Sequence, residues 1–90
     1  MSSTIQSQQA IKTPYTGPRN GYVFVNVATD GAPVLVSILD EDSESLASSG
    51  PRSSISLGTI VRPMIRWYVL IENPNARSVD VTVVVLTPLI

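Results

Sequence analysis

The sequence predicts an all-β fold: a small antiparallel β-sandwich, jelly-roll-like or immunoglobulin-like, built from five or six strands. Several short runs are rich in β-branched and aromatic residues and alternate between apolar and polar side chains, which is typical of strands. Turn-forming Gly, Pro, Asn and Asp residues separate these runs every 8–12 residues. No helical apolar period persists beyond one turn, so the pattern predicts no helix of ordinary length.

The 90 residues suffice for one domain, which we divide into an extended N-terminal arm, residues 1–20, and a β-sandwich domain, residues 21–90. The arm is polar, and Pro14 and Pro18 exclude a helix from its second half. We expect the arm to pair with a sheet edge, to lie on a neighbouring subunit or to fold back on its own domain. The sequence does not choose among these three placements.

The strands are expected at residues 21–28, 34–40, 54–61, 64–71 and 79–86. Asp30-Gly31 is a turn dipeptide, so the first two strands are predicted to form a hairpin. The serine-rich stretch 41–54 is predicted to be a polar loop, with a single helical turn at residues 43–47 as the alternative. Pro63 and Pro88 each follow a strand, because proline cannot donate to a strand ladder.

Successive side chains of a strand point to opposite faces, so each strand is expected to contribute one row to the core. The expected core rows are Val23, Val25 and Val27; Val34, Val36 and Ile38; Ile55, Leu57 and Val61; Ile65, Trp67, Val69 and Ile71; and Val79, Val81, Val83 and Val85.

The remaining rows begin polar and turn apolar, whereas a sheet with one wetted face alternates cleanly. Charged residues are 14% of the chain, against about 25% in typical soluble domains. We therefore expect this second face to be covered by another molecule. The predicted interface residues are Tyr22, Phe24, Leu35, Leu39, Met64, Arg66, Tyr68, Leu70, Val84 and Leu86, with Ile60 beside them. Two alternatives stay open: Ser, Thr, Asn and Gln supply the solvated surface, or a register bulge turns some of these side chains into the core.

The amino-acid composition excludes several kinds of functional site. The chain has no cysteine and no histidine, which removes disulfides, the usual zinc and haem ligands and the base of a Ser-His-Asp triad. Its five glycines form no phosphate-binding loop and are expected at turns, strand boundaries or bulges. We therefore predict no enzymatic activity and no cofactor. The net charge of −1 does not predict a nucleic-acid partner.

An acidic cluster is the one candidate metal site. Asp40, Asp42 and Glu44, with Glu41 among them, would offer the carboxylate oxygens that Ca²⁺ prefers. The cluster lacks the spaced Asp-x-Asp-x-Asp-Gly loop of a calcium site. The sequence therefore favours a solvated loop over a metal site.

Three aromatic residues support an alternative function. Tyr22, Phe24 and Tyr68 are expected on one outer face, with Arg66 beside Tyr68. An exposed aromatic row can stack sugar rings or nucleic-acid bases. The alternative is therefore a small carbohydrate- or nucleic-acid-binding β-module. Tyr, Phe, Met and Arg are also enriched in protein interfaces, and the row continues into aliphatic residues, which favours an interface.

The favoured hypothesis is a non-enzymatic structural protein that self-associates through an apolar sheet face. The expected partner is a second copy of the chain or another structural protein, and virion coat proteins, decoration proteins and filament subunits are the settings considered. Contact with a neighbour is expected through the N-terminal arm or the apolar tail, residues 86–90. The sequence shows no secretory signal and no membrane span, so synthesis in the cytoplasm is expected.

Overall fold

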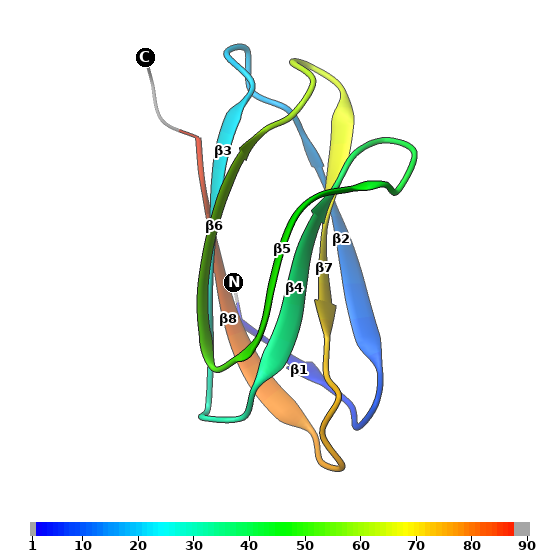
Figure 1. Ribbon diagram of the computed structural model, residues 1–90, viewed down its shortest axis with the longest axis vertical. Helices are drawn as coiled ribbons and strands as arrows, with labels where there is room; N and C mark the ends of the chain where they lie inside the picture. Colours follow the sequence, from blue (N-terminus) through cyan, green and yellow to red (C-terminus); the bar gives the residue numbers. More distant parts are fainter. Residues whose placement is uncertain (1, 88–90) are drawn as a thin grey trace.

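The computed structural model describes residues 2–87, and this part of the chain forms eight strands and no helix (Figure 1). The strands are β1 (Ser2–Ile5), β2 (Ala10–Thr16), β3 (Tyr22–Thr29), β4 (Val34–Leu39), β5 (Ser45–Arg52), β6 (Ser54–Ile60), β7 (Arg66–Glu72) and β8 (Val79–Leu86). They form two four-stranded sheets, sheet A with the order β1-β8-β3-β6 and sheet B with the order β2-β7-β4-β5. The predicted all-β sandwich is confirmed, with eight strands in place of five or six.

The strands pair in a nested pattern. β1 pairs with β8, β2 with β7, β3 with β6 and β4 with β5, all antiparallel. The first half of the chain thus folds back along the second half, and the doubled chain wraps into two layers. Further pairs, β3 with β8 and β4 with β7, complete each sheet. The hairpin predicted for residues 21–28 and 34–40 is therefore wrong, because β3 and β4 lie in different sheets and the turn between them crosses from one layer to the other. Eight strands in two sheets with this nesting form a jelly roll, one of the two topologies that the sequence predicted.

The two additional N-terminal strands come from the segment that was expected to be an arm. Of the three placements left open for it, the structure shows pairing with sheet edges, since β1 lies against β8 and β2 against β7. Pro14 lies inside β2, where proline is tolerated because β2 is the edge strand of sheet B. Residues 2–16 are therefore part of the sandwich and not an appended arm.

The predicted loop at residues 41–54 is wrong for most of its length, because β5 covers residues 45–52 of it. No helical turn forms, and Ser43 has a left-handed backbone (φ 64°). β5 pairs with β4 through two register shifts, which a serine-rich strand with one exposed face tolerates. Its apolar pattern is too weak to identify it as a strand before its partner β4 is known.

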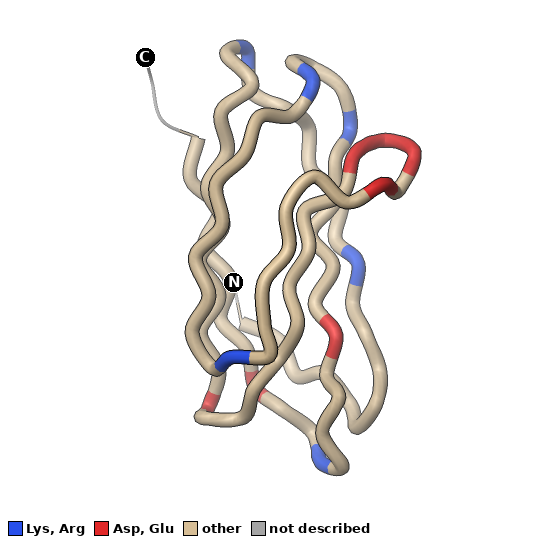
Figure 2. The backbone as a smooth tube through the Cα atoms, viewed as in Figure 1, with Lys and Arg blue, Asp and Glu red and all other residues tan. Residues whose placement is uncertain are grey.

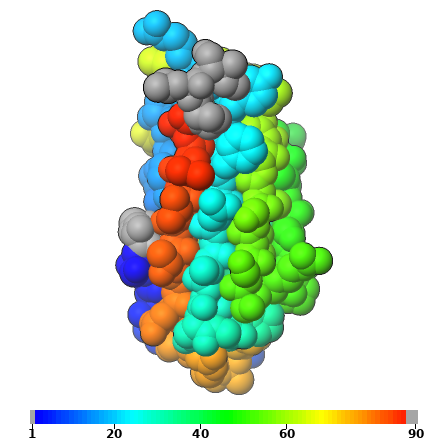
Figure 3. Space-filling model, turned by 90° about the vertical axis from the view of Figure 1, so that its left-hand side faces the viewer, coloured from blue at the N-terminus to red at the C-terminus, as the bar shows by residue number. Residues whose placement is uncertain are grey.

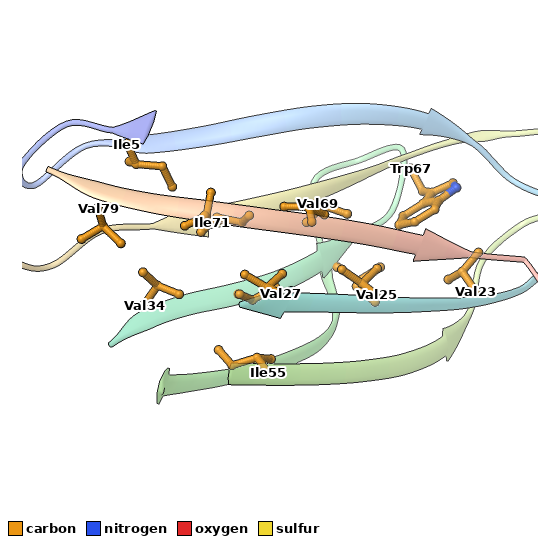
Figure 4. Packing of buried hydrophobic residues seen from close by; sticks show 14 of the residues in the cluster. Ile5, Val23, Val25, Val27, Val34, Ile55, Trp67, Val69, Ile71 and Val79 are labelled. Atoms are coloured by element: carbon orange, nitrogen blue, oxygen red, sulfur yellow. The ribbon is translucent and has the colours of Figure 1, made fainter. Parts of the chain in front are cut away.

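The core lies between the two sheets and consists mainly of the inward rows of β3, β4, β7 and β8 (Figure 4). Ile5 of β1 and Ile55 of β6 add to it, whereas β5 contributes no buried residue. The predicted rows on β3, β4 and β8 are buried as expected, except that Val85 is only partly buried at the end of its strand. Trp67, the largest fully buried side chain, stacks on Tyr15 with ring centroids 5.0 Å apart. The prediction that Ile65 belongs to the core is wrong. It lies in the turn before β7 and is 42% exposed, because β7 begins only at Arg66.

One buried polar side chain, Asn73, ties two connections together at one end of the sandwich. The Asn73 amide Nδ2 donates to the carbonyl oxygens of Ile5 (3.0 Å), Gln6 (3.1 Å) and Arg77 (2.8 Å). Its Oδ1 accepts from the backbone N–H and from the side-chain amide of Asn75, at 2.9 and 2.8 Å. Asn73 is 2% exposed, so these groups depend on one another and not on water.

Replacing Asn73 tests this network. Asn73→Ala leaves buried carbonyl groups without donors and is expected to lower the free energy of unfolding by about 2–4 kcal/mol. Asn73→Asp keeps the acceptor oxygen but sets a carboxylate against carbonyl oxygens. It should lower the free energy of unfolding by at least as much as Asn73→Ala. Chemical denaturation measures both, with the exposed Asn26→Ala on β3 as the control, expected within about 0.5 kcal/mol of wild type. A cost at Asn73 no larger than at Asn26 would contradict the network's role.

An ion pair lies at the same end. Arg77 donates from Nη1 to Oδ2 and from Nη2 to Oδ1 of Asp30, at 3.2 and 3.1 Å. The Asp80 backbone N–H donates to the same carboxylate at 3.3 Å. Hydrogen bonds from Arg77 first, then from Asp80, hold the pKa of Asp30 below its ordinary value.

The lowered pKa predicts a pH dependence of stability. Because the folded state binds the proton less well than the unfolded state, the Asp30 contribution is complete above the ordinary pKa, near pH 4, and is lost as the pH falls toward the lowered one. The stability difference between wild type and Asp30→Asn should be constant from about pH 7 to about pH 5 and shrink below about pH 4. Denaturation curves across this range measure the difference. An unchanged difference at about pH 3 would show that Asp30 is not coupled to folding.

Candidate assembly surface on the outer face of sheet A

The outer face of sheet A carries a patch of apolar side chains near one end of the sandwich. In Figure 3, β8, β3 and β6 lie side by side across this face. The apolar patch consists of Tyr22, Phe24, Ile60, Val84 and Leu86, which are 41–60% exposed. Three strands bring them together. Tyr22 lies opposite Ile60 on β6, Phe24 lies opposite Leu86 on β8, and Val84 lies opposite Asn26. Side chains two residues apart on each strand therefore form adjoining columns on one surface.

Gly58 gives the patch its shape. It lies opposite Phe24 in the middle of β6, and a Cβ at this position would come within 2.7 Å of the Phe24 ring. The ring thus lies across the glycine, which shields backbone that a side chain would otherwise cover. Gly58 was expected at a turn, a boundary or a bulge, but it pairs in regular register inside a strand. Its role depends on a cross-strand neighbour and is not visible in its local sequence.

The strands that carry the patch are almost free of charge. Within the strands of sheet A, Asp80 is the one charged residue in the part of the chain that is described. The strands of sheet B carry four, namely Lys12, Arg52, Arg66 and Glu72. In Figure 2 the backbone of β3, β6 and β8 is tan along its middle, and the charges gather at the ends and loops. The two faces of the sandwich are therefore chemically different.

The ten residues predicted as one interface lie on two opposite faces and a turn. Tyr22, Phe24, Val84 and Leu86 belong to sheet A, whereas Leu35, Leu39, Arg66, Tyr68 and Leu70 belong to sheet B and Met64 lies in the turn between β6 and β7. The second face expected from the sequence is thus two surfaces. The ambiguity arises because alternation shows which residues share a face of one strand but not which sheet the strand joins.

The sheet B part of this set is largely covered within a single chain. Leu39 is 6% exposed, and Leu35, Leu70 and Tyr68 are partly buried. Lys12 on β2 lies over the Tyr68 ring, with Nζ 4.4 Å from the ring centroid, and donates to Ser43 Oγ at 2.6 Å. The predicted aromatic row therefore does not exist as one surface, because Tyr68 lies on the other sheet from Tyr22 and Phe24.

The acidic cluster is organised by its own backbone. Asp40 Oδ1 accepts the backbone N–H groups of Asp42 and Glu44, both at 2.9 Å, and Glu41 pairs with Arg62 at 2.8 Å. Among residues 2–87, no three His, Cys, Asp or Glu side chains are grouped closely enough to hold a metal ion. The candidate calcium ligands Asp40, Asp42 and Glu44 are thus a hydrogen-bonded turn between β4 and β5.

This arrangement predicts no response to calcium. Since Asp40 already serves two N–H donors, about 10 mM CaCl₂ should leave the thermal midpoint equal to that in NaCl of the same ionic strength. Asp40→Ala should lower the free energy of unfolding by about 1–2 kcal/mol with or without calcium, because two loop N–H groups lose their acceptor. A midpoint that rises with calcium and stops rising in Asp40→Ala would establish a site instead.

Two open hollows lie on the outer face of sheet B and meet at Leu35 and Glu72. Gln8, Gln9 and Asn73 are among the residues that line one of them, and Ser37, Ser48 and Ser49 are among those that line the other. Glu72 is the one titratable group among the residues that line them, so neither hollow holds the pair of groups that acid–base catalysis uses.

No known family model or curated protein matches the sequence. Residues 2–87 also contain no helix that could cross a membrane. A proposal about function must therefore be argued from the exposed residues of the sandwich.

Proposed function

We propose that this protein is a non-enzymatic building block that self-associates through the outer face of sheet A. The apolar patch on an almost uncharged face is the observation that carries the proposal. Five large side chains, each about half exposed, leave on the order of 400 Å² of apolar surface, which is typical of the largest, often functional, patch on a monomer.

The chemistry of the patch fits another protein surface. It combines two aromatic rings with three aliphatic side chains, and aromatic side chains are enriched at the centre of protein interfaces where charge is depleted. Aliphatic neighbours offer nothing to a sugar hydroxyl or a phosphate. Two such faces packed together would lie about 10 Å apart, as the layers of a sandwich do.

The setting proposed for such a block is a coat, a decoration layer or a filament. Jelly rolls occur in viral capsid proteins and also in lectins, and the fold is shared by many functions, so the fold does not select among these settings. The proposal depends on the exposed face and not on the fold.

Paired threonine substitutions test the contact. Ile60→Thr with Val84→Thr keeps β-branched side chains but removes apolar area from the patch. In a two-fold contact each change occurs twice, so we expect a loss of about 3–4 kcal/mol, or a dimer dissociation constant about 10²–10³-fold higher. Light scattering across a concentration series measures this constant.

A control and an overturning result are available. Leu46→Gln changes an apolar side chain of similar exposure on β5 of sheet B, and should leave association unchanged. A wild-type protein that stays monomeric at about millimolar concentration would overturn the proposal. Glycan or oligonucleotide binding by that monomer, lost in Phe24→Ala, would establish the binding-module alternative.

A further inference from the structure

Sheet edges offer a second surface. A strand at an edge has unpaired backbone groups, and proteins usually protect such edges with short strands, proline, lysine or bulges. The edge strands here are β1 and β6 in sheet A and β2 and β5 in sheet B. β1 has four residues, β2 contains Lys12 and Pro14, and β5 has two register shifts and Pro51. Three of the four edges are therefore protected.

β6 has none of these protections. Its seven residues, SISLGTI, include no proline and no charge, and it pairs with β3 in an unbroken register. It thus presents a regular seven-residue edge without proline or charge, next to a face that is itself almost uncharged. In Figure 1, β5 leaves β6 after the turn that joins them, and it belongs to the other sheet.

The ladder shows which backbone groups point outward. At its two ends, Val61 N–H donates to Gly21 O at 2.8 Å and Thr29 N–H donates to Ser53 O at 2.9 Å. Odd-numbered residues of β6 therefore bond to β3, since bonding alternates along an antiparallel pair. The N–H and C=O groups of Ser54, Ser56, Gly58 and Ile60 point to the open edge.

The β6 edge adjoins the apolar patch, and its sequence is compatible with pairing against β6 of a second copy of the chain. Ile60 belongs to both surfaces, because its side chain lies in the patch and its backbone on the edge. Antiparallel pairing around a two-fold axis near Leu57 would set Ser56 opposite Gly58, with no charged side chain inside the strand pair. Arg52 and Arg62 flank the strand, and Arg62 is already paired with Glu41.

We propose that β6 is the strand-pairing edge for a second copy of this chain, joining two copies of sheet A into one continuous sheet. The inference rests on the proposed self-association and extends it. The patch supplies about half of the roughly 800 Å² that each partner buries in a stable interface. A single two-fold contact also closes at a dimer, whereas a face contact together with an edge contact builds a larger assembly.

Amide hydrogen exchange followed by NMR tests the edge directly. Protein is compared at concentrations below and above the association midpoint found by light scattering. The outward amides of Ser56 and Gly58 should exchange about tenfold or more slowly in the associated state. The inward amides of Ile55 and Leu57 should change little, because β3 protects them in both states. Face stacking alone would not produce this alternation.

Matched lysine variants complete the test. Ser56→Lys sets a charge on the edge and should abolish the alternating protection, whereas Ala28→Lys, on the same face in the interior strand β3, should retain it. If the wild type associates but Ser56 and Gly58 exchange equally fast in both states, the edge proposal is overturned and the face contact stands. If the wild type never associates, both proposals fail.

Discussion

The fold depends on burying rows of mainly β-branched side chains between the two sheets, chiefly from β3, β4, β7 and β8. Val23, Val25 and Val27 of β3 are 0–2% exposed. The inward rows of β4 and β7 meet them across the layer, and the row of β8 lies beside them in sheet A. With 90 residues and no cysteine, the chain has a small core and no disulfide to reinforce it. The inner rows are therefore constrained, and the outer rows are free to carry function.

Nested pairing explains how so short a chain closes its layer. Each half of the chain finds its partner in the other half, so strands far apart in sequence, such as β1 and β8, are adjacent. The connections then gather at the two ends of the sandwich. Asn73 satisfies backbone carbonyls from two of these connections, and Asn75 reaches a third through Pro33 O at 2.7 Å. Buried polar groups at this end thereby hold the connections in one arrangement.

The outer faces of sheet A and sheet B, which the core does not constrain, differ in chemistry. On sheet B, Lys12 and a hydrogen-bonded acidic turn cover the Tyr68 region within one chain. On sheet A the apolar patch lies open beside an uncharged edge. The proposed self-association would use both features of sheet A, one through side chains and the other through backbone. A protein with two such surfaces can form an array, in which each contact has its own symmetry axis.

Local pattern was sufficient for the fold class and for most of the core. Alternation of β-branched residues identified β3, β4, β6, β7 and β8, and the bounds of β8 are those predicted. It failed for β1, β2 and β5, whose serine, threonine and proline content resembles that of a loop. These segments become strands because a partner edge supplies their hydrogen bonds, and no local window contains that partner.

The sequence by itself determined which residues are apolar and which of them share a face of one strand. Only the tertiary structure decided which strands share a sheet, and so which apolar rows meet. For that reason Tyr22, Phe24, Val84 and Leu86 form one surface with Ile60, while Tyr68 and Leu70 lie on the opposite side. The physical reason is that alternation is a property of a single strand, whereas a surface depends on the register between strands distant in sequence.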